Sequence, residues 1–286
     1  MASVSFSQYS MWSSCPRQYK HKYIDNLSES TTNIHLIFGS AMHTTLQSFL
    51  SVMYGVNKTT AMNMDLDAAL RINLINEFKS AQKDLKDGES PCTKEELIEF
   101  FEDGKKIIDY FKKKLPAFFS KKGYELVAIE LPLNIKIKEH IHFKGFLDVV
   151  VREIETKEIT IVDFKTSTKG WGKYQKTDKI KNSQILLYKK FYSEKYEVSE
   201  DMINIEFHIL KRKLYENTEY TVPRISRHEP SHGKISMKKA WVGFMEFVDT
   251  VFDENGDYIT NIEYPKKPSK LCEWCEFFHR NICDGK

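Results

Sequence analysis

The sequence predicts an α/β fold in which helices flank a mixed β-sheet. Helical patterns fill the chain to about Lys114, and from Tyr124 the hydrophobic period changes toward that of strands. A further helix, strand and helix follow the strands, and this order is typical of a sandwich built around a mixed sheet. With 286 residues, 41% of them hydrophobic, the chain is long enough to bury one large core, or one core with a small appended domain.

The expected elements follow in chain order. A mostly apolar stretch predicts a helix over 35–55, and a second helix is expected at about 65–86, before the breaking segment 87–91. Thr93 and Glu96 form a capping-box pattern that opens a helix running to about Lys114. The later expected elements are strands at 125–133, 133–138, 141–151 and 159–164, a helix at about 179–196, strands at 203–210 and around 214–222, and a helix at 236–252.

Two apolar segments carry acidic residues in a pattern that suggests chemistry. Asp148 is the lone acid of Gly145–Val150, and Asp163 is followed two residues later by Lys165. The charged stretch 152–158 is typical of a hairpin turn, so antiparallel strands would bring both carboxylates to one end of one sheet, with Lys165 on the face of Asp163. This set suits a hard divalent cation and an activated water that attacks a phosphodiester. A structural ion pair is the alternative, although a carboxylate among apolar neighbours is costly without a partner or a metal.

Four further side chains are candidates for the same site, and three of them have both a structural and a functional interpretation. His43 offers a neutral nitrogen that completes a metal shell, or it is a structural histidine of its helix. Gln184 and Tyr188 lie one turn apart on the helix that follows Lys165, where they orient that lysine or hold a phosphate, or else only edge an amphipathic helix. Glu130 is another carboxylate on an otherwise apolar strand.

The segment from Lys165 to Lys181 is basic, although the net charge of the whole chain is only +3. It holds six lysines and one acid, with Trp171 and Tyr174 among them. Basic groups with interleaved aromatics suit phosphates and unstacked bases, and a solvated lysine-rich loop is an equal alternative.

The order of these motifs resembles the RecB-type branch of the PD-(D/E)XK nuclease superfamily. The resemblance rests on His43, Glu130, Gly145-x-x-Asp148, Asp163-Phe164-Lys165-Thr166-Ser167 and Gln184-x-x-x-Tyr188, with Ser5–Tyr9 and Cys15–Tyr19 at the start, and it spans residues 5 to 283. It implies a restriction-endonuclease-like core in which His43, Asp148, Asp163 and the Phe164 carbonyl bind two Mg²⁺ or Mn²⁺ ions. It further implies that Lys165 positions or activates the attacking water, that Gln184 and Tyr188 support Lys165 and the DNA, and that Glu130 is a commonly acidic position.

The five cysteines do not predict a disulfide scaffold. Cys272 and Cys275 form a metal-type pair, Cys283 follows, and Cys15 is a fourth candidate at the other end of the chain. Four thiolates of this kind suit a [4Fe-4S] cluster, and similar nucleases, including AddB and the CRISPR-associated RecB-like exonucleases, pair one N-terminal cysteine with a C-terminal trio. The spacing before Cys283 is longer here than is usual in those relatives, so zinc held by Cys272, Cys275, His279 and Cys283 is the main alternative, and free thiols are the remaining one. Arg17, Tyr19 and Trp274 would contact single-stranded DNA or pack around the cluster.

The expected organisation is a cluster region made of 1–30 and 263–286, a helical region over 31–122 that contributes His43, and a nuclease core over 123–262. No apolar run has the length of a membrane span, the first residues lack the pattern of a signal peptide, and no Walker-type phosphate loop is found. We therefore expect a cytoplasmic protein that leaves duplex unwinding to a separate helicase or recombination protein. The resemblance suggests DNA repair or recombination in a prokaryotic or phage-infected cell.

The expected function is a metal-dependent DNA nuclease, an exonuclease acting on single strands or DNA ends. A catalytically silent DNA-binding subunit with the same fold is one alternative, against which the intact Asp148, Asp163 and Lys165 argue. A structure- or sequence-specific endonuclease is the other, although the sequence has no separate specificity domain.

Overall fold

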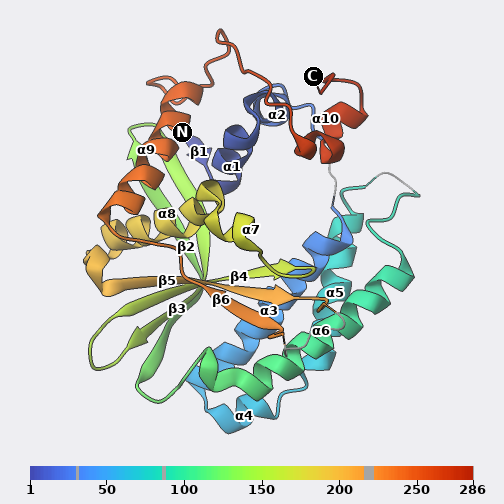
Figure 1. The fold of residues 1–286 in the computed structure, drawn as a ribbon, viewed down its shortest axis with the longest axis vertical. Coiled ribbons are helices and arrows are strands. Elements are labelled where there is room, and N and C mark those ends of the chain that lie inside the picture. The colour runs from blue at the N-terminus through green and yellow to red at the C-terminus, as the bar shows by residue number, and fades with distance from the viewer. Residues whose placement is uncertain (30–31, 86–87, 216–221, 286) are drawn as a thin grey trace.

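A computed structural model describes residues 1–29, 32–85, 88–215 and 222–285. Helices cover both faces of a mixed β-sheet, which confirms the predicted fold class (Figure 1). Within the described ranges, no helix is both long enough and apolar enough to cross a membrane.

The sheet has six strands, in the order β1-β3-β4-β5-β6, with β2 paired to β3. Their bounds are Ala2–Val4 (β1), Tyr124–Lys138 (β2), Ile141–Glu153 (β3), Ile159–Ser167 (β4), Ile203–Lys211 (β5) and Ile225–His228 (β6). Strand β2 pairs along the whole of β3, so β1 and β4 must share the opposite edge of β3. On that edge β4 pairs with residues 149–152 and β1 with 141–143, which leaves a gap between the two ladders.

The helices have the following bounds: Phe6–Ser14 (α1), Pro16–Tyr19 (α2), Ile34–Gly55 (α3), Lys58–Met62 (α4), Leu66–Gln82 (α5), Lys94–Lys114 (α6), Lys173–Thr177 (α7), Lys179–Tyr196 (α8), Lys234–Val251 (α9) and Glu276–His279 (α10). A π-helical turn at Lys20–Ile24 extends α2, and short 3₁₀ turns occur at Leu115–Ala117, Glu200–Met202 and Lys270–Trp274. The predicted capping box is present at the start of α6, where Thr93 and Glu96 each accept a backbone N–H of the other.

Two hydrophobic clusters form the core, one on each face of the sheet. Side chains of α1, α8 and α9 pack on one face, where Phe143, Phe191 and Phe244 are fully buried. Helices α3, α5 and α6 cover the other face, where Phe38 and Phe164 are buried. Strand residues alternate between the two clusters, as expected for a sheet that is covered on both sides.

One strand prediction was wrong in detail, and another is mostly untested. The segments 125–133 and 133–138 form the single strand β2, because its partner β3 is long enough to pair with all of it. The strand predicted around 214–222 falls mostly on 216–221, outside the described residues, and its described ends Leu214, Tyr215 and Val222 are not in a strand. The strand that pairs with β5 is β6, which begins at Ile225. The predicted end of the second helix near 86 also falls outside the described ranges, and α5 ends at Gln82.

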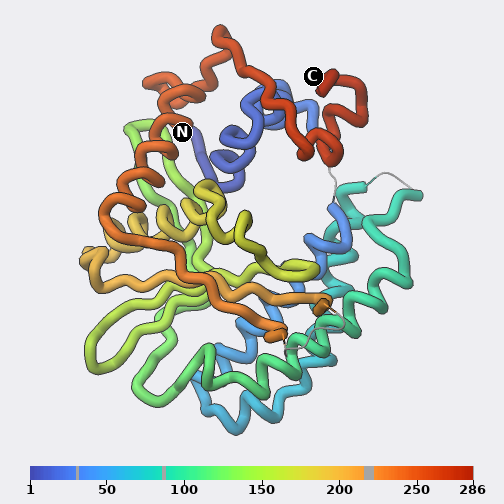
Figure 2. Tube along the Cα trace, in the orientation of Figure 1, coloured from blue at the N-terminus to red at the C-terminus, as the bar shows by residue number. Residues whose placement is uncertain are grey.

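The two ends of the chain lie side by side (Figure 2). The Arg17 side chain donates to the Tyr264 carbonyl at 2.7 Å, and the Ser28 hydroxyl donates to Glu276 at 2.6 Å. Segments about 250 residues apart in the sequence are thereby joined into one region next to the sheet.

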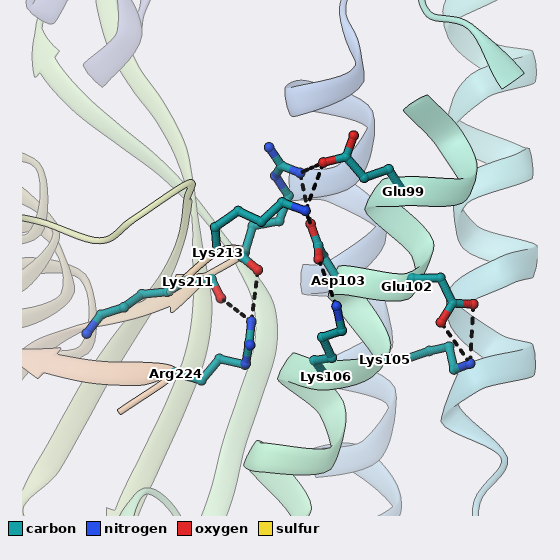
Figure 3. A network of polar contacts seen from close by, with 9 residues as sticks. Glu99, Glu102, Asp103, Lys105, Lys106, Lys211, Lys213 and Arg224 are labelled. Atoms are coloured by element: carbon teal, nitrogen blue, oxygen red, sulfur yellow. Dashed lines mark hydrogen bonds and ion pairs between the residues drawn. The ribbon is translucent and has the colours of Figure 1, made fainter. Parts of the chain in front are cut away.

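A network of charges ties α6 to the end of β5 (Figure 3). The carboxylate of Asp103 is buried and lies 2.8 Å from both Arg212 Nη1 and Lys213 Nζ. Glu99 accepts from the same two cations at 2.8 and 2.9 Å. Arg224 donates to the carbonyl of Arg212 at 2.8 Å and so holds the backbone of this segment.

Candidate active site

The first part of the site joins α3 to the interior of β3 and β4, where these two strands stop pairing, and not to one end of the sheet as predicted. His43 Nδ1 lies 3.3 Å from Asp148 Oδ2, and the Phe164 amide donates to the same oxygen at 2.8 Å. Residue 164 lies two positions beyond Val162, the last β4 residue paired with β3, so its amide is outside that ladder. The Asp148 carboxylate therefore satisfies a backbone donor at the point where the two strands stop pairing.

The second part of the site is an ion pair on β4. Lys165 Nζ lies 2.8 Å from Asp163 Oδ2, as the two-residue spacing predicted for side chains on one face. The Asp163 side chain is 4% exposed, and its Oδ2 has the ion pair but no contact of hydrogen-bond geometry. Lys165 Nζ also lies 5.7 Å from the centre of the Phe207 ring on β5, which limits where the ammonium group points.

Burial sets the protonation states of these groups. It raises the pKa of Asp163, although Lys165 acts in the opposite direction. The pKa of Asp148 is raised well above its usual value, first by burial and then by the negative charge of Asp163. Burial, with a smaller effect of the Lys165 charge, lowers the pKa of His43 to about 3, so that its imidazole is neutral at physiological pH.

Gln184 and Tyr188 border the carboxylates from α8. The Gln184 amide donates to the Tyr188 hydroxyl at 3.2 Å, and burial followed by the charge of Asp163 raises the pKa of that hydroxyl. Gly145 leaves room for the tyrosine, since a Cβ there would lie 3.0 Å from Phe143 and 3.3 Å from Tyr188. The predicted pair thus lies beside Asp163.

Glu130 on β2 lies across the ladder from Asp148, between the pairs Ile129–Val149 and Leu131–Leu147. Its carboxylate accepts from the amide of Gln47 at 2.5 Å, and the same amide lies 3.3 Å from the carbonyl oxygen of Asp148. The sequence interpretation missed Gln47. Its position one turn after His43 on α3 was the available signal.

The donor set fits a divalent cation, although it is not closed around one. In the described part of the chain, no group of three or more His, Cys, Asp or Glu side chains is arranged to hold a metal ion. The Asp163 Oδ2 atom is nevertheless buried with an ion pair to Lys165 but no contact of hydrogen-bond geometry, and the pKa values of Asp148 and Asp163 are both raised. A neutral imidazole and a backbone carbonyl complete the set of groups that such a cation prefers.

The four candidate cysteine ligands line one surface cavity, together with Arg17, His21 and Lys266. Cys15 Sγ accepts a weak hydrogen bond from the amide of Lys267 at 3.5 Å. His279, the alternative zinc ligand, has its Nε2 2.8 Å from the carbonyl oxygen of Glu273. Cys92, which the sequence interpretation did not assign, is buried in the core on the other side of the sheet.

The aromatic residues of the basic segments have different environments. Trp171 packs on Phe207 and His228, while Tyr174 on α7 is 90% exposed. Tyr19 is fully buried, so it belongs to the core and is closed to DNA, whereas Trp274 is 82% exposed. Tyr174 and Trp274 are therefore the exposed rings among these candidates.

A mixed sheet flanked by helices brings two carboxylates and a lysine together on adjoining strands, which is the chemistry that a metal-dependent nuclease uses. A family model of the PD-(D/E)XK nuclease superfamily matches residues 3–284, and the chain belongs to this superfamily. Among curated proteins no significant match was found. Membership implies a metal-dependent nuclease that uses Mg²⁺ or Mn²⁺ and has DNA as its substrate.

Proposed function

We propose that this chain is an exonuclease that acts on single-stranded DNA or DNA ends by two-metal phosphodiester hydrolysis. The observation that carries the proposal is the meeting of His43 with Asp148 and of Asp163 with Lys165 where β3 and β4 separate. His43, Asp148, Asp163 and the carbonyl of Phe164 would hold the Mg²⁺ or Mn²⁺ ions. When bound, such ions lower the pKa of water and neutralise charge on the phosphate.

The chain's own residues would orient the reacting groups. Lys165 has three donors and no acceptor, and its contacts with Asp163 and Phe207 direct it to a phosphate oxygen or to the attacking water. Gln184 and Tyr188 would support Lys165 and the DNA from the buried side of the site, and the raised pKa of the Tyr188 hydroxyl keeps it a hydrogen-bond donor. Glu130 would act as an additional carboxylate at the side of Asp148.

The preference for single strands is supported by the segment that follows β4. Six lysines between Lys165 and Lys181 would attract phosphates, and the exposed ring of Tyr174 would stack on an unpaired base. Stacking on a free ring requires a base that is not already stacked in a duplex. Duplex unwinding would then come from a separate helicase or recombination protein, in the cytoplasm of a prokaryotic or phage-infected cell.

One gel tests this function. Labelled linear single-stranded, linear duplex and circular single-stranded DNA are each incubated with Mg²⁺, Mn²⁺ or EDTA, with Asp163→Asn as the inactive control. We expect the linear single strand to be degraded to short products with either metal, and the circle and the EDTA samples to stay intact. Cleavage of the circle would instead indicate an endonuclease. Binding of DNA without cleavage under every condition would indicate a silent subunit.

We also propose that Cys15, Cys272, Cys275 and Cys283 hold a [4Fe-4S] cluster, which would join 1–30 and 263–286 into one region beside the helical region 31–122 and the nuclease core 123–262. All four thiols line one cavity, and basic residues around it suit the negative charge of four thiolates. The contact of His279 with a backbone carbonyl favours this set over zinc at Cys272, Cys275, His279 and Cys283.

Anaerobic purification tests the cluster. We expect brown protein that contains iron and loses its colour in Cys15→Ser but keeps it in His279→Ala. Colourless protein that contains zinc, keeps that zinc in Cys15→Ser and loses it in His279→Ala would show the alternative set. The nuclease proposal does not depend on this result, because it rests on Asp148, Asp163 and Lys165.

A further inference from the structure

Glu130 has an unusual backbone conformation for its position in a strand. Its φ is 48°, in the left-handed region that residues with a Cβ rarely adopt. The ladder on either side of it is regular, with Ile129 opposite Val149 and Leu131 opposite Leu147. Such local strain persists only where the surroundings impose it, and it is concentrated at functional sites.

The contact that holds Glu130 comes from Gln47. This side chain is only 4% exposed, and its amide nitrogen lies 2.5 Å from Glu130 Oε1 and 3.3 Å from the carbonyl oxygen of Asp148. Gln47 is on α3, one turn after His43, so the two side chains point to the same side of the helix. One amide group therefore connects α3 with both β2 and β3.

The chemistry of the amide matters as much as its position. A lysine or arginine here would neutralise Glu130, whereas the glutamine NH₂ group has two donors and no charge. Glu130 is exposed apart from this contact, so one oxygen of its carboxyl group stays accessible next to Asp148. The NH₂ group of Gln47 donates to the Glu130 carboxylate on β2 and to the Asp148 carbonyl on β3. These two contacts fix the separation of Glu130 and Asp148.

We propose that Gln47 is a positioning residue that holds Glu130 beside Asp148, so that the Glu130 carboxylate contributes to binding of the divalent cation. This inference rests on the proposed metal-dependent nuclease function. Groups that orient metal-binding carboxylates typically change metal affinity about 10- to 100-fold when they are removed. Gln47 acts through Glu130, so replacing Gln47 should no longer change metal affinity when Glu130 is replaced by an uncharged residue.

The test compares Gln47→Leu, Glu130→Gln and the double variant. Mn²⁺ affinity is measured by titration calorimetry, the Mn²⁺ dependence of cleavage is measured with linear DNA, and the melting temperature is measured in EDTA. Asn73→Leu is the matched control, because Asn73 is an amide that donates to Thr45 of α3 at 2.9 Å on another side of that helix. We expect about 10-fold weaker Mn²⁺ binding in Gln47→Leu and in Glu130→Gln. The double variant should bind as Glu130→Gln does, and Asn73→Leu should bind as the unchanged protein does.

Two results would overturn the proposal: unchanged Mn²⁺ affinity in Gln47→Leu, or effects that multiply in the double variant. If Gln47→Leu fails to fold, Gln47→Asn replaces it, because the shorter amide keeps the polarity but does not reach Glu130. Failure of the nuclease proposal is distinguishable, since the unchanged protein would then bind Mn²⁺ without cleaving DNA and the titrations would still decide the role of Gln47. Absence of Mn²⁺ binding by the unchanged protein would reject both.

Discussion

Replacing Asp103 by alanine would remove the centre of the charge network between α6 and the end of β5 (Figure 3). The Asp103 side chain is 2% exposed and contacts Arg212 and Lys213 at 2.8 Å. Arg212 is only 11% exposed, and its guanidinium carbon lies 3.9 Å from the centre of the Phe100 ring. The alanine variant would therefore leave a buried cation with Glu99 as its remaining acidic contact.

The size of the effect follows from this burial. Removing one partner of a buried ion pair typically costs about 3–5 kcal/mol, because the other charge stays buried without compensation. Glu99 still contacts Arg212, so we expect the low end of that range, about 3 kcal/mol. At roughly 2–4 °C for each kcal/mol in a chain of this size, the melting temperature should fall by about 6–12 °C.

Thermal melting and urea denaturation of purified protein measure the loss. Glu99→Gln is the control, since Glu99 is 51% exposed and surface pairs contribute little, and its melting temperature should stay close to that of the unchanged protein. Asp103→Leu combined with Arg212→Met should be more stable than Asp103→Ala, because both buried charges are then absent. A loss below about 1 kcal/mol in Asp103→Ala would refute the reasoning, since that is the value of an exposed pair.

Three further predictions concern the site. Asp163→Asn should lower cleavage at least about 100-fold and raise the melting temperature in EDTA. The pKa of Asp163 is raised, so the stability that this carboxyl contributes is present below its unfolded-state pKa and is lost as pH rises through the folded-state pKa. The melting temperature of Asp163→Asn should therefore exceed that of the unchanged protein by more at neutral than at acid pH, and this difference should disappear with Mg²⁺. His43→Ala should lower activity and shift the metal optimum from Mn²⁺ toward Mg²⁺, because imidazole favours Mn²⁺, and an unchanged metal titration would leave His43 a structural residue. Tyr174→Ala should weaken binding of single-stranded DNA by about 1–3 kcal/mol and leave duplex binding unchanged, as measured by fluorescence anisotropy; equal losses on both would show that no base stacks on Tyr174.

The sequence was sufficient to predict the elements whose signals are local. The capping box at Thr93 and the apolar period after it defined α6, and the helix over Lys179–Tyr196 was predicted with its observed bounds. The hairpin between β3 and β4 was also predictable, because two β-branched runs flank one charged turn. These features depend on residues close together in the chain.

Contacts between distant segments were less accessible. The parallel pairing of β1 with β3 joins Ala2 to Ile141, and three residues give too short a pattern to predict a strand. Gln47 meets Glu130 across 83 positions, and the left-handed conformation of Glu130 contradicts the preference of glutamate. Trp171 and Tyr174 have similar sequence surroundings, yet only Trp171 has the Phe207 ring beneath it.

The placement of the site follows from the way β3 changes partners. On one edge, β3 pairs with β4 over 149–152 and with β1 over 141–143, and Asp148 falls in the gap between these ladders. Asp148 has no partner on β4, and its carboxylate accepts a hydrogen bond from the Phe164 amide. Asp163 directly precedes Phe164, so it lies at the same opening, which is the gap between the two ladders. Helix α3 reaches the opening from one face of the sheet with His43, and α8 reaches it from the other with Tyr188. Burial raises the pKa of Asp148 and Asp163, so their ionised forms lower the stability of the fold, and burial of the two hydrophobic clusters offsets this cost.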